Sequence, residues 1–88
     1  MPMVWVPSLM QKLTDGQAHV EVEGETVRQV IENLDAAFPG FKARVCDEND
    51  RLRHDVAVAV DSEVSSEGMR RKVKPDSEVN FLPALAGG

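Results

Sequence analysis

The chain has 88 residues, enough for one domain with a modest core and too few for a second lobe around a deep catalytic cleft. Apolar residues make up 42% and charged residues 28%, values that favour a folded globular domain over a disordered segment. The net charge of −5 repels a phosphate backbone, and the few aromatic residues are not interleaved with basic ones, so nucleic acid is a poor candidate partner.

The chain has too few cysteine and histidine residues for a disulfide framework or a zinc site. The single cysteine, Cys46, excludes an internal disulfide, and with only His19 and His54 available it cannot complete a zinc site. No stretch approaches the roughly 20 apolar residues of a membrane span, and the N-terminus lacks a basic region and a long apolar run. We therefore expect a cytoplasmic protein without membrane contact, monomeric when free, that binds no metal or cofactor.

The first predicted elements form a hairpin. Residues 4–6, Val-Trp-Val, favour a strand that Pro7 ends, and residues 14–16, Thr-Asp-Gly, give a turn signal. Apolar and polar residues alternate over 18–23, which predicts a second strand with Val20 and Val22 facing a core.

A helix is predicted next, beginning at a capping box. Thr26 can accept from the backbone N–H of Gln29, whose side chain can reach back. Pro39-Gly40 ends the helix. Its apolar stripe consists of Val27, Val30, Ile31, Leu34 and Phe38. Because an isolated helix of this length is marginal, the stripe indicates packing on a sheet.

The next segment contains the clearest strand. Residues 41–46 predict a short helical turn, and residues 47–50 a polar loop. Over residues 52–60, Val56, Val58 and Val60 alternate with small alanines, which is typical of a long central strand.

The last third of the chain contains short elements separated by turns. Residues 61–62 predict a turn and residues 63–64 a short edge strand, followed by an irregular stretch through Lys74. Residues 75–77, Pro-Asp-Ser, predict another turn, and residues 78–81 form the final strand with the apolar side chains inward. Two strands, a helix and returning strands predict an α+β domain of the β-grasp type, a mixed sheet wrapped around one main helix, with the last strand parallel to the first.

The final strand runs into a terminal glycine pair. Residues 79–83 read Val-Asn-Phe-Leu-Pro, and the sequence ends Gly87-Gly88. Further matching segments are Val4-Trp5-Val6-Pro7-Ser8-Leu9, Gly24-Glu25-Thr26-Val27, Phe38-Pro39-Gly40 and Val58-Ala59-Val60-Asp61. Through these segments, which cover nearly the whole chain, the sequence resembles the MoaD/ThiS family of ubiquitin-like sulfur carriers. Its opening and its Leu-Pro-Ala-Leu-Ala-Gly-Gly ending look closest to the CysO subfamily, which serves a cysteine-synthesis pathway.

The resemblance implies a domain of residues 1–82 and a flexible tail of residues 83–88. It implies a co-substrate of other enzymes rather than an enzyme. An ATP-using partner of the ubiquitin-activating type (MoeB/ThiF-like) would adenylate the carboxylate of Gly88, which would then become a thiocarboxylate. The acceptor of the sulfur would be a cysteine-synthase-like enzyme, or next the large subunit of molybdopterin synthase, and a metal-dependent peptidase is a further possible partner.

The residue types of the tail suit this chemistry independently. Residues 82–88 span about 20 Å when extended, enough to enter another protein's active site. Gly87 and Gly88 lack a Cβ, so their backbone can approach nucleotide and catalytic groups closely. Pro83 has no N–H, which predicts that the sheet ends where the tail leaves it.

The resemblance places Pro7, Val64 and Leu82 on a surface that docks the activating enzyme, and Leu85 is expected beside Leu82. A second interpretation is that Val64 and Leu82 only cap the sheet edge.

We interpret the remaining candidate site residues as structural rather than functional. The basic run of Arg70, Arg71, Lys72 and Lys74 is interpreted as a solvated face, and Cys46 as a buried apolar residue. His19 and His54 are expected on strands, where they face solvent or satisfy local hydrogen bonds rather than bind metal. Two functions remain as alternatives: a protein modifier conjugated to lysine through Gly88, and a non-covalent β-grasp binding module.

Overall fold

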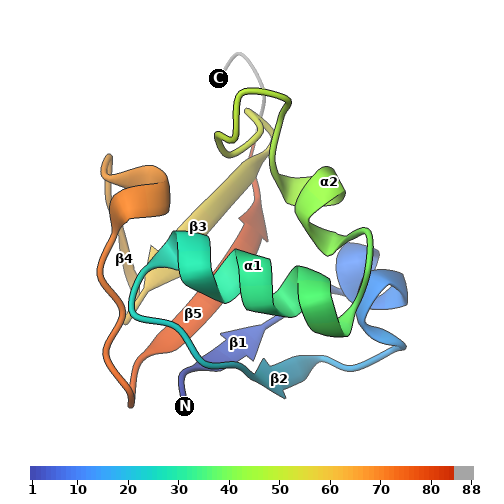
Figure 1. The fold of residues 1–88 in the computed structure, drawn as a ribbon, viewed down its shortest axis with the longest axis horizontal. Coiled ribbons are helices and arrows are strands. Elements are labelled where there is room, and N and C mark those ends of the chain that lie inside the picture. The colour runs from blue at the N-terminus through green and yellow to red at the C-terminus, as the bar shows by residue number, and fades with distance from the viewer. Residues whose placement is uncertain (85–88) are drawn as a thin grey trace.

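The computed structural model describes residues 1–84, and Leu85, Ala86, Gly87 and Gly88 lie outside the described residues. One mixed sheet carries the fold, and helix α1 crosses one of its faces (Figure 1). The strands are β1 (Met3–Trp5), β2 (His19–Glu21), β3 (Val56–Val60), β4 (Glu63–Val64) and β5 (Glu78–Pro83). The helices are α1 (Val27–Ala37), α2 (Phe41–Val45) and two 3₁₀ helices, η1 (Ser8–Thr14) and η2 (Gly68–Arg70).

The strand order is β2-β1-β5-β3-β4. β1 pairs antiparallel with β2 and parallel with β5, whereas β3 pairs antiparallel with both β5 and β4. The last strand therefore lies in the middle of the sheet beside the first. This topology confirms the predicted α+β fold with a parallel pair formed by the two ends of the chain.

The start of α1 is the predicted capping box. Thr26 Oγ1 accepts the Gln29 N–H at 3.2 Å, and Gln29 Oε1 accepts the Glu25 N–H at 2.8 Å. Reciprocal bonds of this kind satisfy backbone donors that the first turn of a helix leaves free. They place the apolar stripe of α1 against the sheet from its first residue, Val27, which is fully buried.

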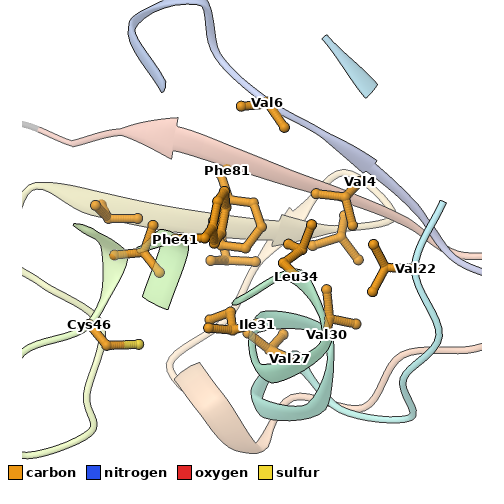
Figure 2. Close-up of a cluster of buried hydrophobic side chains, with 14 of the residues drawn as sticks. Val4, Val6, Val22, Val27, Val30, Ile31, Leu34, Phe41, Cys46 and Phe81 are labelled. Atoms are coloured by element: carbon orange, nitrogen blue, oxygen red, sulfur yellow. The ribbon is translucent and has the colours of Figure 1, made fainter. Parts of the chain in front are cut away.

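The core lies between this stripe and the inner face of the sheet (Figure 2). Alternation along the strands turns Val4, Val79 and Phe81 inward, each no more than 1% exposed. The rings of Phe41 and Phe81 meet edge to face, with centroids 5.3 Å apart. Helix α2 thus closes the core at the end of the sheet where β5 leaves it.

Gly24 permits the close approach of the loop before α1. A Cβ built on this residue would lie 2.7 Å from Cγ2 of Val30, and its φ is +158°. Only glycine fits this contact without displacing the helix. The Gly-Glu-Thr-Val segment is therefore shaped by packing as well as by helix capping.

The expectation of a strand over residues 52–60 is wrong in its first part. β3 begins at Val56, and Leu52 makes only an isolated bridge with Cys46. The Asp47 carboxylate accepts the N–H groups of Asn49 and Arg51, which folds the segment into a compact loop. His54 consequently lies in a turn rather than on a strand, although it is exposed as expected.

Candidate functional site

β5 is the last strand before the C-terminal residues of the sequence. The prediction that the sheet ends before Pro83 is wrong, because β5 extends through Pro83, which pairs with Val56. The next residue, Ala84, still donates its N–H to the Asp55 carbonyl at 2.9 Å. The strand is therefore longer than the sequence predicts.

The register explains why proline is tolerated there. The Asp61 N–H donates to the Glu78 carbonyl, and the Ala84 N–H to the Asp55 carbonyl. Because bonded and non-bonded pairs alternate along an antiparallel ladder, the Val56–Pro83 pair is a non-bonded one. The nitrogen of Pro83 thus faces the other side of β5, where β1 has already ended at Trp5.

The predicted tail of residues 83–88 is described only in its first two residues. Leu85, Gly87 and Gly88 lie outside the described residues, so the division of the chain at residues 82 and 83 stays a prediction. Ala84 is the last residue with a described contact to the sheet. Four residues follow it, and when extended they reach about 13 Å.

The outer face of the sheet, opposite α1, brings exposed apolar residues together. Strand register places Val64, Ala59, Asn80, Trp5 and His19 in one row across all five strands. Leu82 stands on the same face, opposite Ala57. Val64 is 66% exposed and Leu82 is 40% exposed. Val64 and Leu82, two of the five residues predicted to dock a partner, therefore share a face, although their docking role stays a prediction.

Trp5 belongs to the same face and was not predicted as a site residue. Its indole is 39% exposed and lies 5.1 Å from the ring of His19, centroid to centroid. The indole N–H donates to Glu78 Oε1 at 2.9 Å. Strict alternation after Val4 was the signal that could have identified Trp5 as an outward residue. We define the outer-face patch as Trp5, Val64 and Leu82.

Pro7 is placed differently from the other predicted residues. It is half-buried and precedes η1, where its carbonyl accepts the Met10 N–H at 2.8 Å. Since β1 and β5 are parallel, Pro7 follows β1 at the end of the sheet where Pro83 lies. Leu9, on η1, is 77% exposed and was also not predicted. The structure thus shows a local role for Pro7 in starting η1.

Carboxylates border the outer-face patch. Glu21 and Glu78 lie in the row of Met3, next to that of Trp5, and Asp61 follows β3. The Glu78 N–H and the Ser77 hydroxyl, which both donate to Asp61, hold the pKa of that carboxyl below its usual range. An acidic border complements a partner surface that carries basic residues.

The remaining candidates carry no visible chemistry. Cys46 is buried, and desolvation raises the pKa of its thiol, which disfavours the reactive thiolate. Within residues 1–84, no three His, Cys, Asp or Glu side chains gather as a metal site would require. None of the helices in that range is long and apolar enough to cross a bilayer.

Comparison with known proteins gives consistent matches over the full length. The model of the ThiS family matches residues 4–88. The sulfur carrier protein CysO of Mycobacterium tuberculosis is 32% identical over 89 aligned residues, covering 97% of this chain and 96% of CysO. A chain in the crystal structure of the Amycolatopsis orientalis BexX/CysO complex superposes with a TM-score of 0.91 at 32% identity, with 100% of each chain covered. The small archaeal modifier protein SAMP1 of Methanosarcina acetivorans, at 20% identity and a TM-score of 0.81 over 99% of this chain and 95% of its own, shares the fold.

These likenesses confirm the β-grasp, ubiquitin-like fold predicted from the sequence. The matching sequences belong to small ubiquitin-like carriers rather than to catalysts. The resemblance to CysO, first seen at the two ends of the chain, extends over nearly all of it. The chain belongs to the ThiS family.

Proposed function

We propose that this protein is a sulfur carrier whose C-terminal carboxylate, on Gly88, is adenylated, converted to a thiocarboxylate and used as a sulfur donor. The observation that carries the proposal is the 32% identity to the sulfur carrier CysO over 97% of the chain. The central strand β5, which leads toward the terminal Gly87-Gly88, supports it. Cysteine synthesis is the favoured destination of the sulfur, and molybdopterin synthesis is the next.

The proposed chemistry divides between this chain and its partners. A carboxylate is a poor electrophile, so its oxygen first attacks the α-phosphate of ATP, forming an acyl-adenylate and releasing pyrophosphate. A sulfide-equivalent donor then attacks the carbonyl carbon, and AMP leaves with the C–O electron pair. The MoeB/ThiF-like partner supplies the nucleotide site, whereas this chain supplies the carboxylate and a narrow backbone. The acceptor enzyme, cysteine-synthase-like in the favoured case, takes the sulfur.

The outer-face patch is the proposed docking surface for these enzymes. Exposed aromatic and aliphatic side chains at the centre of an interface with a charged border are typical of residues that carry binding energy. Pro7, Pro83 and Leu85 are proposed to extend the contact toward the terminus. Because the patch is bordered by carboxylates, we expect basic residues at the edge of the partner's contact surface.

Mass spectrometry tests the proposal directly. The full chain is incubated with ATP, a sulfide donor and the cognate activating enzyme, and the expected product has one oxygen of Gly88 replaced by sulfur. Deleting Gly88 should abolish the conversion while circular dichroism stays unchanged. Absence of the sulfur-containing product from full-length protein, with an activating enzyme that adenylates it, would refute the carrier role.

Deletions at the C-terminus also separate the two alternative functions. High-mass conjugates in cell extracts that disappear on deletion of Gly88 would indicate a protein modifier joined to lysine. Full biological activity after deletion of both Gly87 and Gly88 would indicate a non-covalent binding module. Either result contradicts sulfur donation as the sole function.

A further inference from the structure

The outer edge of β3 is only partly covered by its neighbouring strand. β4 pairs with Ala59 and Val60 alone, so no strand of the described chain lies beside Val56 and Val58 on that side. In Figure 1, η2 and the first turn of α1 flank this stretch of β3. The arrangement leaves a β-strand edge at the floor of a depression.

This depression, the β3-edge hollow, has a volume of about 190 Å³. Aliphatic side chains predominate in its lining, which also includes one cation. The lining includes Val27, Leu52, Val56, Val58 and Val64, together with Arg71. Since a cavity of about 150 Å³ can hold benzene, the hollow has room for one branched aliphatic side chain.

Backbone geometry adds a hydrogen-bonding edge to the hollow. Odd-numbered residues of β3 bond to β5, as the bonds of Asp55 and Asp61 show. Alternation therefore directs the N–H of Val58 to the opposite edge, beyond the last residue that pairs with β4. A backbone carbonyl of an extended peptide can accept this donor, as in recognition by strand addition.

The charge around the hollow is basic although the protein is acidic. Arg51 and Arg70 line a second depression, which shares Leu52 and Gly68 with the first. Among residues 1–84, neither of these arginines nor Arg71 takes part in an ion pair.

The carboxylates nearby offset little of that charge. Asp50, in the second depression, is paired with Arg28 and with Lys42, whose Nζ lies 3.1 Å from Asp50 Oδ1. Glu67 is the other carboxylate there, and its Oε1 accepts the Ser65 hydroxyl. The positive charge of Arg51, Arg70 and Arg71 is therefore left largely uncompensated by the described residues, which favours an anionic ligand.

We propose that the β3-edge hollow binds an extended acidic segment of a partner protein. One branched aliphatic side chain of the segment fills the hollow, its backbone pairs with Val58, and its flanking carboxylates pair with Arg71 and Arg70. Nucleic acid fits worse, because the wall offers aliphatic groups and no stacking ring, and the chain carries a net charge of −5. The proposal does not depend on sulfur transfer. Val64 and Ala57 belong to both the hollow and the outer face, so one partner can cover both.

Titration of the ¹⁵N-labelled protein with the peptide acetyl-Glu-Asp-Leu-Val-Glu-Asp-amide tests this site. The largest amide shifts are expected at Val58, Ser65, Gly68 and Arg71. Arg71→Gln should weaken binding about fivefold, the scale of one partly exposed charge pair. Lys74→Gln removes the same charge from the same basic run, outside the hollow, and should leave the affinity within about twofold. Glu67→Gln should strengthen binding.

Three results would overturn the proposal. The first is an absence of shifts at the hollow at millimolar peptide, and the second is equal loss of affinity in Arg71→Gln and Lys74→Gln. The third is undiminished binding of a peptide whose Leu-Val pair is replaced by Gly-Gly, which would indicate a diffuse charge effect. The ¹⁵N spectrum of each variant shows whether its fold is intact. Arg71→Gln is expected to keep the fold, because the Arg71 carbonyl that accepts the Val27 N–H at 2.9 Å belongs to the backbone.

Discussion

The two halves of β5 differ in how they are held. Val79 and Asn80 pair with β1 on one side and β3 on the other, and Glu78 pairs with β1 alone. Residues 81–83 pair with β3 alone. Val79 and Phe81 are buried in the core, but Leu82 and Pro83 are exposed. One continuous strand thus passes from the best-anchored part of the fold to its surface within a few residues. Stability depends on the buried residues up to Phe81, and the proposed contacts with partners depend on the exposed residues that follow it.

The largest expected effect separates neighbouring residues of this strand. Phe81→Ala should lower the free energy of unfolding by about 3–5 kcal/mol, because it empties a site between Phe41 and the stripe of α1. Leu82→Ala, next in sequence and exposed, should cost less than about 1 kcal/mol. Urea unfolding of both variants measures the contrast. Similar losses would show that burial does not decide which residues of β5 anchor the fold.

Proline substitutions test the register of the ladder. Asn80→Pro removes an N–H directed at β3 and should cost about 3 kcal/mol or more. Pro83→Ala should change stability by less than about 1 kcal/mol, because the nitrogen of Pro83 faces away from β3. Thermal unfolding compares the two variants. A large gain or loss in Pro83→Ala would contradict the non-bonded position assigned to this residue.

The exposed half of β5 is expected to act in partner recognition. Leu82→Asp should lower the rate of adenylation at low carrier concentration about tenfold, through weaker docking rather than through unfolding. Ala36→Asp adds the same charge to the exposed surface of α1 and should have little effect. Steady-state pyrophosphate release measures both. Equal rates for wild type and Leu82→Asp would remove Leu82 from the docking surface.

The smallest effect concerns the turn that precedes β5. The hydrogen bonds from Glu78 and Ser77 lower the pKa of the Asp61 carboxyl below its usual range, so the unfolded state binds this proton more readily. The stabilising contribution is therefore present above about pH 4 and is lost as pH falls through the folded-state pKa.

Urea midpoints at a series of acidic pH values measure this dependence. Asp61→Asn should flatten the loss of stability in acid, whereas Asp76→Asn, in the exposed turn nearby, should follow the wild type. An unchanged acid profile in Asp61→Asn would show that the hydrogen bonds to Asp61 do not contribute.

Local patterns determined much of this protein. The Thr26–Gln29 capping box, the apolar stripe of α1 and the alternation before Val60 act between residues close in sequence, so the sequence alone predicted these elements and the core. The order of elements and the terminal glycines also pointed to the family. The docking residues Val64 and Leu82 were indicated by resemblance, not by any local pattern.

Tertiary structure decided where strands begin and end and which exposed residues meet. Pro83 stays in β5 because β1 stops beside it, and the strand before Val56 is replaced by a loop closed by Asp47. The row that joins Val64 to Trp5 depends on the register of all five strands, and the β3-edge hollow on the short length of β4. Pairing between strands distant in sequence sets these features, because each strand's hydrogen-bonding groups are satisfied only by its neighbours.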